Sequence, residues 1–244
     1  MIRQRLGKDL LFFDGGMGTL LQEKGLAPGE LPETWNLTHS EEIYKIHRQY
    51  IEAGSDIILT NTFGANALKF HDDSCSLEEI IKAAVSHVKK AEREALLQTG
   101  DERKIYTALD VGPTGKLLKP MGDLEFETAY EAFKEVVILG EQAGADLIHI
   151  ETMSDTYELK AAVLAAKENT SLPVFATVIF DERKKLLTGA DVSSVVALLE
   201  GLGVDALGIN CAMGPKEMLP VLEELIKYSS VPIIVKPERR ENIL

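Results

Sequence analysis

The sequence Ala143-Gly144-Ala145-Asp146-Leu147-Ile148-His149-Ile150-Glu151-Thr152 places a small turn and an acidic residue before an apolar run that ends on polar side chains. The same design recurs at residues 53–62 and 202–211. Each copy follows a segment with helical periodicity, which is typical of a helix closed by glycine, a tight turn and a buried parallel strand. We therefore expect functional side chains where these strands end.

Apolar runs bounded by turn residues predict seven strands, with helical patterns between them. Strand and helix alternate, which indicates parallel pairing with right-handed crossovers. The long first connection, residues 15–38, is expected to be a loop that forms a lid or wall of a site. The predicted strands are residues 11–14, 56–61, 105–110, 146–151, 174–179, 205–210 and 231–236, and the predicted helices are 40–53 (capped by Ser40), 77–98, 124–143, 155–167, 191–202 and 215–228.

Two architectures contain such a pattern, an open doubly wound sheet and a closed eight-stranded barrel. The segment Asp14-Gly15-Gly16-Met17-Gly18-Thr19 lacks the Gly-x-Gly-x-x-Gly spacing of a dinucleotide site in an open sheet. Polar residues end nearly every strand, which favours a barrel with its site on that face. The sequence predicts one domain, an incomplete TIM (β/α)8-type barrel over residues 1–237 with seven strands and the eighth βα unit missing, followed by a tail at 238–244.

Composition restricts the class of partner and the location. A formal net charge of −13 argues against binding nucleic acid through its phosphates. No apolar run approaches the roughly 18 residues of a membrane span, and no signal peptide is evident, so we expect no membrane partner and a cytoplasmic location. Two cysteines, Cys75 in a polar segment and Cys211 after an apolar strand, are too few for a disulfide framework.

Carboxylates stand at three predicted strand ends. Asp14 precedes two glycines whose backbone amides could approach a bound carboxylate or phosphate, although a plain turn would need the same residues. Asp110 is expected to shape the site wall or a turn. Glu151 is expected to point into the barrel, where it needs a cation, either a substrate ammonium or a neighbouring lysine. His149 lies on the same side of that strand and is interpreted as a core histidine bonded to backbone.

Cys211 is the candidate thiol, but one cysteine is weakly diagnostic because buried inert thiols are common. A catalytic zinc site needs three protein ligands, and the sequence has no Cys-x-x-Cys or His-x-x-x-His to supply them. A cysteine hydrolase needs a positioned histidine, and nothing connects a histidine to Cys211.

Five ordered motifs closely resemble the homocysteine S-methyltransferase family, and within it the amino-terminal homocysteine-binding domain of the cobalamin-dependent methionine synthases. The resemblance covers residues 10–237. The motifs are Asp14-Gly15-Gly16-Met17-Gly18-Thr19, Thr60-Asn61-Thr62-Phe63, Asp110-Val111-Gly112-Pro113-Thr114-Gly115, Glu151-Thr152 and Gly208-Ile209-Asn210-Cys211.

The resemblance implies a (β/α)8 barrel that transfers a methyl group to homocysteine and forms methionine. Zinc would be held by three cysteines, of which Cys211 matches the first, and would lower the pKa of the substrate thiol from about 8.5. The methyl donor would be methylcobalamin on a partner domain or protein, or a sulfonium or betaine donor in other branches. The backbone near Asp14 and Gly15 would hold the substrate carboxylate and Glu151 its ammonium. The implied substrate-binding residues are Asp14, Gly15, Gly16, Thr60, Asn61, Asp110 and Glu151.

The sequence departs from the family after Pro237, because the chain ends at Leu244 without the adjacent cysteine pair of the eighth strand. The codons GAA-CGC-CGG for Glu238-Arg239-Arg240, read one base later, begin AAC-GCC-GG and encode the family's Asn-Ala-Gly. We therefore hypothesise a one-base insertion, which sequencing of the parent gene would test. Methyl transfer is expected to be impaired, and the open barrel edges near Leu11 and Ile233 are expected to cause self-association.

Two other functions compete with this one. The first is a non-catalytic module that binds an amino acid or docks a corrinoid protein. The second is an unrelated barrel enzyme that uses Glu151 or Asp110 as a base on a phosphorylated sugar. The second is disfavoured because no phosphate-binding glycine loop follows the seventh predicted strand.

Overall fold

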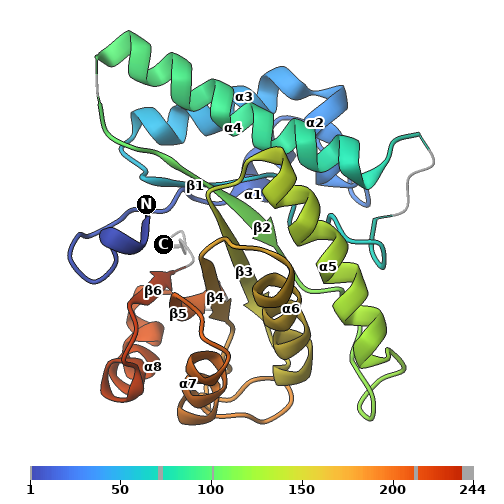
Figure 1. The fold of residues 1–244 in the computed structure, drawn as a ribbon, viewed down its shortest axis with the longest axis vertical. Helices are drawn as coiled ribbons and strands as arrows, with labels where there is room; N and C mark the ends of the chain where they lie inside the picture. Colours follow the sequence, from blue (N-terminus) through green and yellow to red (C-terminus); the bar gives the residue numbers. More distant parts are fainter. Residues whose placement is uncertain (1, 71–73, 101, 212–213, 238–244) are drawn as a thin grey trace, which may run out of the picture.

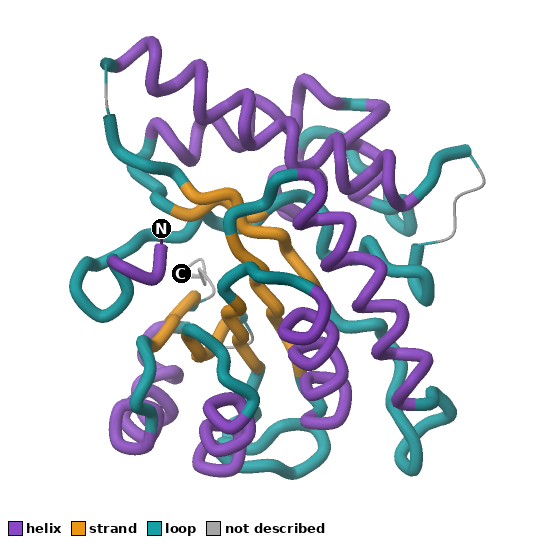
Figure 2. The backbone as a smooth tube through the Cα atoms, in the orientation of Figure 1, coloured by secondary structure: helices purple, strands orange, loops and turns teal. Residues whose placement is uncertain are grey.

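A computed structural model describes residues 2–70, 74–100, 102–211 and 214–237, and the predicted tail at 238–244 lies outside them. One parallel sheet contains six strands in chain order, each paired with the strand before it. The sheet is curled, and the helices cover its outer face (Figures 1 and 2). The strands are β1 (Ile57–Leu59), β2 (Tyr106–Val111), β3 (Leu147–Met153), β4 (Val174–Val178), β5 (Ala206–Asn210) and β6 (Ile233–Lys236).

Helices follow the strands as the sequence pattern predicts, and their ends are defined by local chemistry. Ser76 accepts a hydrogen bond from Glu79 N while the Glu79 side chain accepts one from Ser76 N, a reciprocal cap that begins α4. Gly144, with φ of +96°, ends α5. The helices are α1 (Met17–Glu23), α2 (Trp35–Thr38), α3 (Ser40–Glu52), α4 (Leu77–Thr99), α5 (Phe126–Ala143), α6 (Thr156–Asn169), α7 (Val192–Gly201) and α8 (Pro215–Tyr228), with 3-10 turns η1 (Ile2–Gln4) and η2 (Pro32–Thr34).

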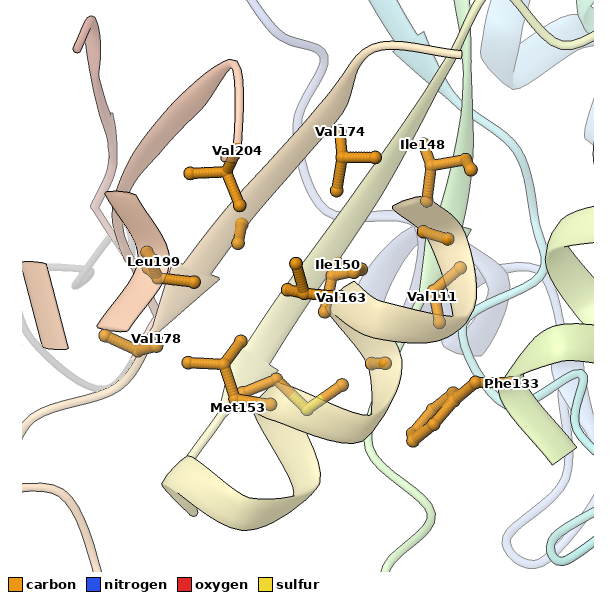
Figure 3. Packing of buried hydrophobic residues seen from close by; sticks show 14 of the residues in the cluster. Val111, Phe133, Ile148, Ile150, Met153, Val163, Val174, Val178, Leu199 and Val204 are labelled. Carbon is orange, nitrogen blue, oxygen red and sulfur yellow. The ribbon is translucent and has the colours of Figure 1, made fainter. Parts of the chain in front are cut away.

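Alternate residues of each strand face opposite sides of the curled sheet. On the outer side, Ile148, Ile150 and Met153 of β3 pack against Phe133 of α5 and Val163 of α6 in the main core (Figure 3). On the inner side, Leu147 belongs to a separate cluster with residues of the other strands. Since side chains alternate with a period of two, His149 and Glu151 follow Leu147 on the inner face. The barrel interior is thus polar at the carboxyl ends of the strands.

The opposite end of the interior, at the amino ends of the strands, is closed by the N-terminal segment. Ile2 of η1 is 2% exposed and packs with Phe175, Ala206 and Ile234 inside the curl. Arg3 binds Asp205, with its Nε 2.5 Å from Oδ1, and so ties η1 to the turn before β5. The interior therefore has an apolar floor beneath its polar strand ends.

The prediction of seven strands is wrong by one, although the incomplete barrel is confirmed. Residues 11–14 form no strand, and Phe13 makes a single parallel bridge to Ile57. Phe12 O accepts hydrogen bonds from the backbone amides of Asp56 and Ile57, so the segment runs beside β1 without extending the ladder. β1 is also shorter than predicted and ends at Leu59, although Thr60 N still donates to Ala108 O of β2.

Residues 15–38 are not the loop that the sequence predicts. They contain α1, η2 and α2, because Leu21 of α1 and Trp35 of α2 pack with Ile43 and Ile46 of α3 in a small core. The expected Ser40 cap is also wrong, since His39 occupies the cap position without a side-chain cap bond. Among the described residues, no helix has the length and apolar character that a membrane span requires.

Candidate functional site

The carboxyl ends of the strands bring the predicted site residues together. Parallel register places Asp110 beside His149 across β2 and β3, and Asn210 beside Lys236 across β5 and β6. Asp14 joins them from the segment beside β1. It is 7% exposed, and its Oδ2 accepts a hydrogen bond of 3.0 Å from Leu59 N. These residues form the strand-end cluster, defined here as Asp14, Asp110, His149, Glu151 and Lys236.

Glu151 is paired with a lysine of the same chain. Its Oε2 lies 2.6 Å from Lys236 Nζ and 3.3 Å from His149 Nε2. The Lys236 ammonium also lies 5.1 Å from the centroid of the Phe13 ring. Of the two cations that the sequence left open for Glu151, the structure contains the neighbouring lysine. His149 is buried as expected, but it contacts Glu151 rather than backbone.

Burial and neighbouring charges give the three carboxyl groups of the cluster very different pKa values. Burial raises the pKa of Asp14 to about 8 despite the charge of Lys236 and the Leu59 amide. Burial, followed by the negative charge of Glu151, also raises the pKa of Asp110 well above its usual value. Burial opposes ionisation of Glu151 too, but the nearby His149 ring and the Lys236 ammonium prevail and lower its pKa to about 2. Glu151 is therefore the carboxyl group of the cluster that ionises most readily, and it does so beside the Lys236 ammonium.

Two buried carboxyl oxygens of the cluster have no hydrogen-bond partner within the described residues. They are Asp14 Oδ1 and Asp110 Oδ1. A buried polar atom without a partner is costly, and such atoms at a site indicate a place for a ligand donor or a water. The cluster can thus accept hydrogen bonds from a cationic or amide-like group.

Thr60 and Asn61 support the site with bonds to other protein groups. Thr60 Oγ1 lies 2.7 Å from Thr62 Oγ1 and accepts a hydrogen bond of 3.1 Å from Asp110 N. Asn61 Nδ2 donates to Pro32 O at 2.7 Å, which connects η2 to the end of β1. Their predicted role as direct substrate contacts remains a prediction.

Gly15 and Gly16 lie exposed at the mouth of the site, and neither has a positive φ. The alternative interpretation, that these two glycines are present because a tight turn requires a positive φ, is therefore wrong. A Cβ on Gly15 would lie 2.7 Å from the Tyr50 hydroxyl, which donates to Gly16 O. Close packing against Tyr50 explains Gly15, and binding of a carboxylate by these amides stays a prediction.

Cys211 directly follows β5 and is exposed. Its backbone amide donates to Lys236 O at 3.0 Å, so the thiol borders the cluster. Asn210 Nδ2 donates to Cys211 Sγ at 3.3 Å and to Thr152 Oγ1 at 2.7 Å. Cys211 and Thr152 have φ values of +53° and +63°, an uncommon conformation for residues other than glycine. Backbone strain of this kind gathers at functional sites.

The described residues do not complete a zinc site. Among residues 2–70, 74–100, 102–211 and 214–237, no group of three or more histidine, cysteine or acidic side chains could hold a metal ion. A structural or catalytic zinc ion needs at least three protein ligands. Cys211 supplies one sulfur.

The sequence of the chain matches the model of the family described as homocysteine S-methyltransferase over residues 11–242. The chain belongs to this family. The expected resemblance is confirmed, and the family is one of methyltransferase enzymes. The matched residues include every member of the strand-end cluster and Cys211.

Two kinds of relative agree with the family. The chain is 33% identical to the methionine synthase of Mycobacterium leprae over 96% of its own length, and it spans 20% of that relative. It has a TM-score of 0.79 and 25% identity to the apo form of the homocysteine methyltransferase MmuM of Escherichia coli, covering 94% of this chain and 82% of that one. The metallated form of MmuM has a TM-score of 0.84 at 24% identity, covering 94% of this chain and 83% of that one, and supports the fold alone.

Sequence reasoning missed Lys236 and Asn210 as site residues. Asn210 lay within a quoted motif, but its bonds to Thr152 and Cys211 need the pairing of strands far apart in the chain. Lys236 ends the apolar run of β6, and a charge at the end of a buried parallel strand was the available signal. Its partner Glu151 is 85 residues away, which only the barrel brings close.

Proposed function

We propose that this chain binds homocysteine within a methyltransferase that forms methionine. One observation carries the proposal: Asp14 Oδ1 and Asp110 Oδ1 are buried carboxyl oxygens without a hydrogen-bond partner in the described part of the chain. They lie at the strand ends of a family that is named for homocysteine. The α-ammonium of an amino acid would donate to these oxygens and favour their ionised form.

We also propose that Cys211 provides one sulfur to a zinc ion whose other ligands lie outside the described residues. Zinc is proposed because the resemblance to the family implies a zinc ion held by three cysteines, of which Cys211 matches the first. The described residues do not by themselves fit a complete zinc site. The proposed methyl donor is methylcobalamin on another domain or protein, which the similarity to a fifth of a methionine synthase supports.

Little methyl transfer is expected from this chain by itself. The single sulfur of the described site favours the second candidate, a module that binds the amino acid or docks a corrinoid protein without catalysis. The cytoplasm remains the expected location, and the boundary of the barrel at residue 237 remains a prediction.

Calorimetry with L-homocysteine under reducing conditions, together with zinc analysis and a methylcobalamin assay, tests these proposals. We expect the wild-type chain to bind L-homocysteine, to hold well under one zinc per chain, and to transfer methyl groups at a background rate. Asp110→Asn should weaken binding about tenfold or more, since it removes an ionisable partner of the ammonium. The exposed Asp123→Asn is the matched control and should bind as the wild type does.

Absence of homocysteine binding in the wild-type chain would contradict the proposed function. One zinc per chain with rapid methyl transfer would instead contradict the impaired activity and exclude the non-catalytic alternative.

Self-association through the open edge of the sheet is a further prediction. In the described part of the chain β6 pairs with β5 alone, and Leu10 and Phe12 beside β1 are 78% and 56% exposed. Unpaired strand edges and exposed apolar side chains promote association. Light scattering at micromolar concentration should give a mass above that of one chain, and a monomer would show that the edge is covered in another way.

A further inference from the structure

Glu33 is a buried acidic residue that lies outside the strand-end cluster. It belongs to η2, in the connection before α2, and only 3% of it is exposed. Its Oε1 accepts a hydrogen bond of 2.5 Å from the backbone amide of Gly64, which ends the post-β1 segment, defined here as residues 60–64. Burial of a carboxyl group is costly, and a hydrogen bond from a backbone amide offsets part of that cost. Glu33 is thus placed to hold the backbone of Gly64.

The contact between Glu33 and Gly64 depends on the absence of a side chain at Gly64. A Cβ at this position would lie 2.8 Å from Glu33 Oε1. Gly64 has no positive φ, so the close approach of Glu33, rather than the backbone conformation, requires the glycine. Asn36 Nδ2 also donates to Asn61 O at 2.8 Å, and Asn61 Nδ2 donates to Pro32 O at 2.7 Å. The helical turns η2 and α2 therefore hold the post-β1 segment at two points.

The post-β1 segment in turn holds the backbone of Asp110. Asp110 N donates to Thr60 Oγ1 at 3.1 Å, and Thr62 Oγ1 donates to Asp110 O at 2.7 Å. Because the Thr62 proton is used in this bond, the 2.7 Å contact between the two hydroxyls is a hydrogen bond from Thr60 to Thr62. These three hydrogen bonds form a closed ring with the peptide groups of Asp110. Phe63 O also accepts a hydrogen bond of 3.0 Å from Gly112 N, so the end of β2 is fixed on both sides of Asp110.

We propose, building on the homocysteine-binding role proposed above, that Glu33 is a positioning residue for the substrate site. Its hydrogen bond to Gly64 fixes the post-β1 segment, and the two threonines of that segment fix Asp110. Asp110 Oδ1 is one of the two buried carboxyl oxygens on which the proposed function rests. Glu33 does not itself contact the substrate and acts through Asp110. Without the bond to Gly64 the segment can shift, and displacements of about 1 Å are enough to weaken a site.

The hydrogen bond of Glu33 can be separated from its charge. Burial and the charge of Glu151 are the main causes of the raised pKa of Asp110, and the charge of Glu33 adds to them. Glu33→Gln removes the charge but keeps a carbonyl oxygen that can accept the hydrogen bond from Gly64 N. Glu33→Ala removes both. Only the alanine variant should therefore disturb the position of Asp110.

Calorimetry with L-homocysteine under reducing conditions tests this assignment. Glu33→Ala should weaken binding about 5- to 10-fold, whereas Glu33→Gln should bind within about threefold of the wild type. The matched control is Glu158→Ala, because Glu158 is also 3% exposed and accepts a hydrogen bond of 2.6 Å from a backbone amide, that of Thr114. The ring of hydrogen bonds around Asp110 comes from the post-β1 segment and not from Thr114, so this control should bind within about threefold of the wild type.

A double-mutant cycle tests whether Glu33 acts through Asp110. Glu33→Ala should change binding less than about twofold when it is introduced into the Asp110→Asn protein. The binding stoichiometry reports the folded fraction, so a Glu33→Ala protein with reduced stoichiometry but unchanged affinity would overturn the inference and leave Glu33 a structural role. An equal loss of affinity in Glu158→Ala, or an equal effect of Glu33→Ala with and without Asp110→Asn, would overturn it as well. A wild-type chain that binds no L-homocysteine would instead overturn the proposed function and, with it, this inference.

Discussion

Gly208→Ala should lower the free energy of unfolding by at least about 3 kcal/mol, because its new methyl group has no room between β5 and β6. A Cβ at Gly208 would lie 1.8 Å from Ile234 O and 2.6 Å from Ile234 C. These are backbone atoms of the paired strand, so relief requires the strands to separate. For a chain of this length the loss corresponds to a melting temperature lower by roughly 6 to 12 °C.

The control for this prediction is Gly201→Ala at the end of α7, where a Cβ would meet nothing within 4 Å. That substitution should be neutral or stabilising by up to about 1 kcal/mol, since alanine favours helix and restricts the unfolded chain. Urea unfolding of both variants gives the comparison. A Gly208→Ala protein as stable as the wild type would mean that β6 lies farther from β5 than described here.

As pH rises, the Asp14→Asn protein should lose much less stability than the wild type. Burial first, with the charge of Glu151 adding to it, raises the pKa of Asp14 from 3.8 to about 8. Between these values the folded chain retains a proton that the unfolded chain has lost, so stability is full at low pH and declines toward the folded pKa. Asparagine cannot titrate, and the two proteins should therefore diverge by up to about 1.4 kcal/mol per pH unit between about pH 5 and about pH 7.

The difference between the two unfolding curves isolates Asp14 from the other titrating groups. His47, for example, is buried with a pKa lowered to about 3, which opposes stability as pH falls, but it contributes to both proteins. The exposed Asp123→Asn should follow the wild type at every pH. If Asp14→Asn also ran parallel to the wild type, Asp14 would be ionised in the folded state at neutral pH.

Most of the fold could be predicted because local signals agree with the tertiary structure. The turn after each helix and the apolar run after it specify β3 and β5 closely, and α8 begins at Pro215 as predicted. The predicted strand at residues 11–14 was wrong because an apolar run does not reveal how many neighbouring strands it will pair with. Helices α1 and α2 were missed because each is short, and tertiary packing of Trp35 rather than periodicity stabilises them.

The site was predictable only in part, for a related reason. Alternation along β2 and β3 is sufficient to place Asp110 and Glu151 on the inner face, so their shared environment follows from the sequence. The ionisation of each group does not, because it depends on burial and on the position of Lys236 in a distant strand. The network of Asn210 with Thr152 and Cys211 likewise joins two strands that are not adjacent in the sheet.

The sheet order, in which each strand pairs with the one made just before it, also has a consequence for biosynthesis. As the polypeptide leaves the ribosome, every new strand finds its template already assembled, and no early strand waits for a late partner before it can dock. During synthesis, the unpaired edge of the sheet is always the edge of the newest strand. Cellular factors that shield nascent chains would therefore be needed most at the edge formed by the strand most recently added.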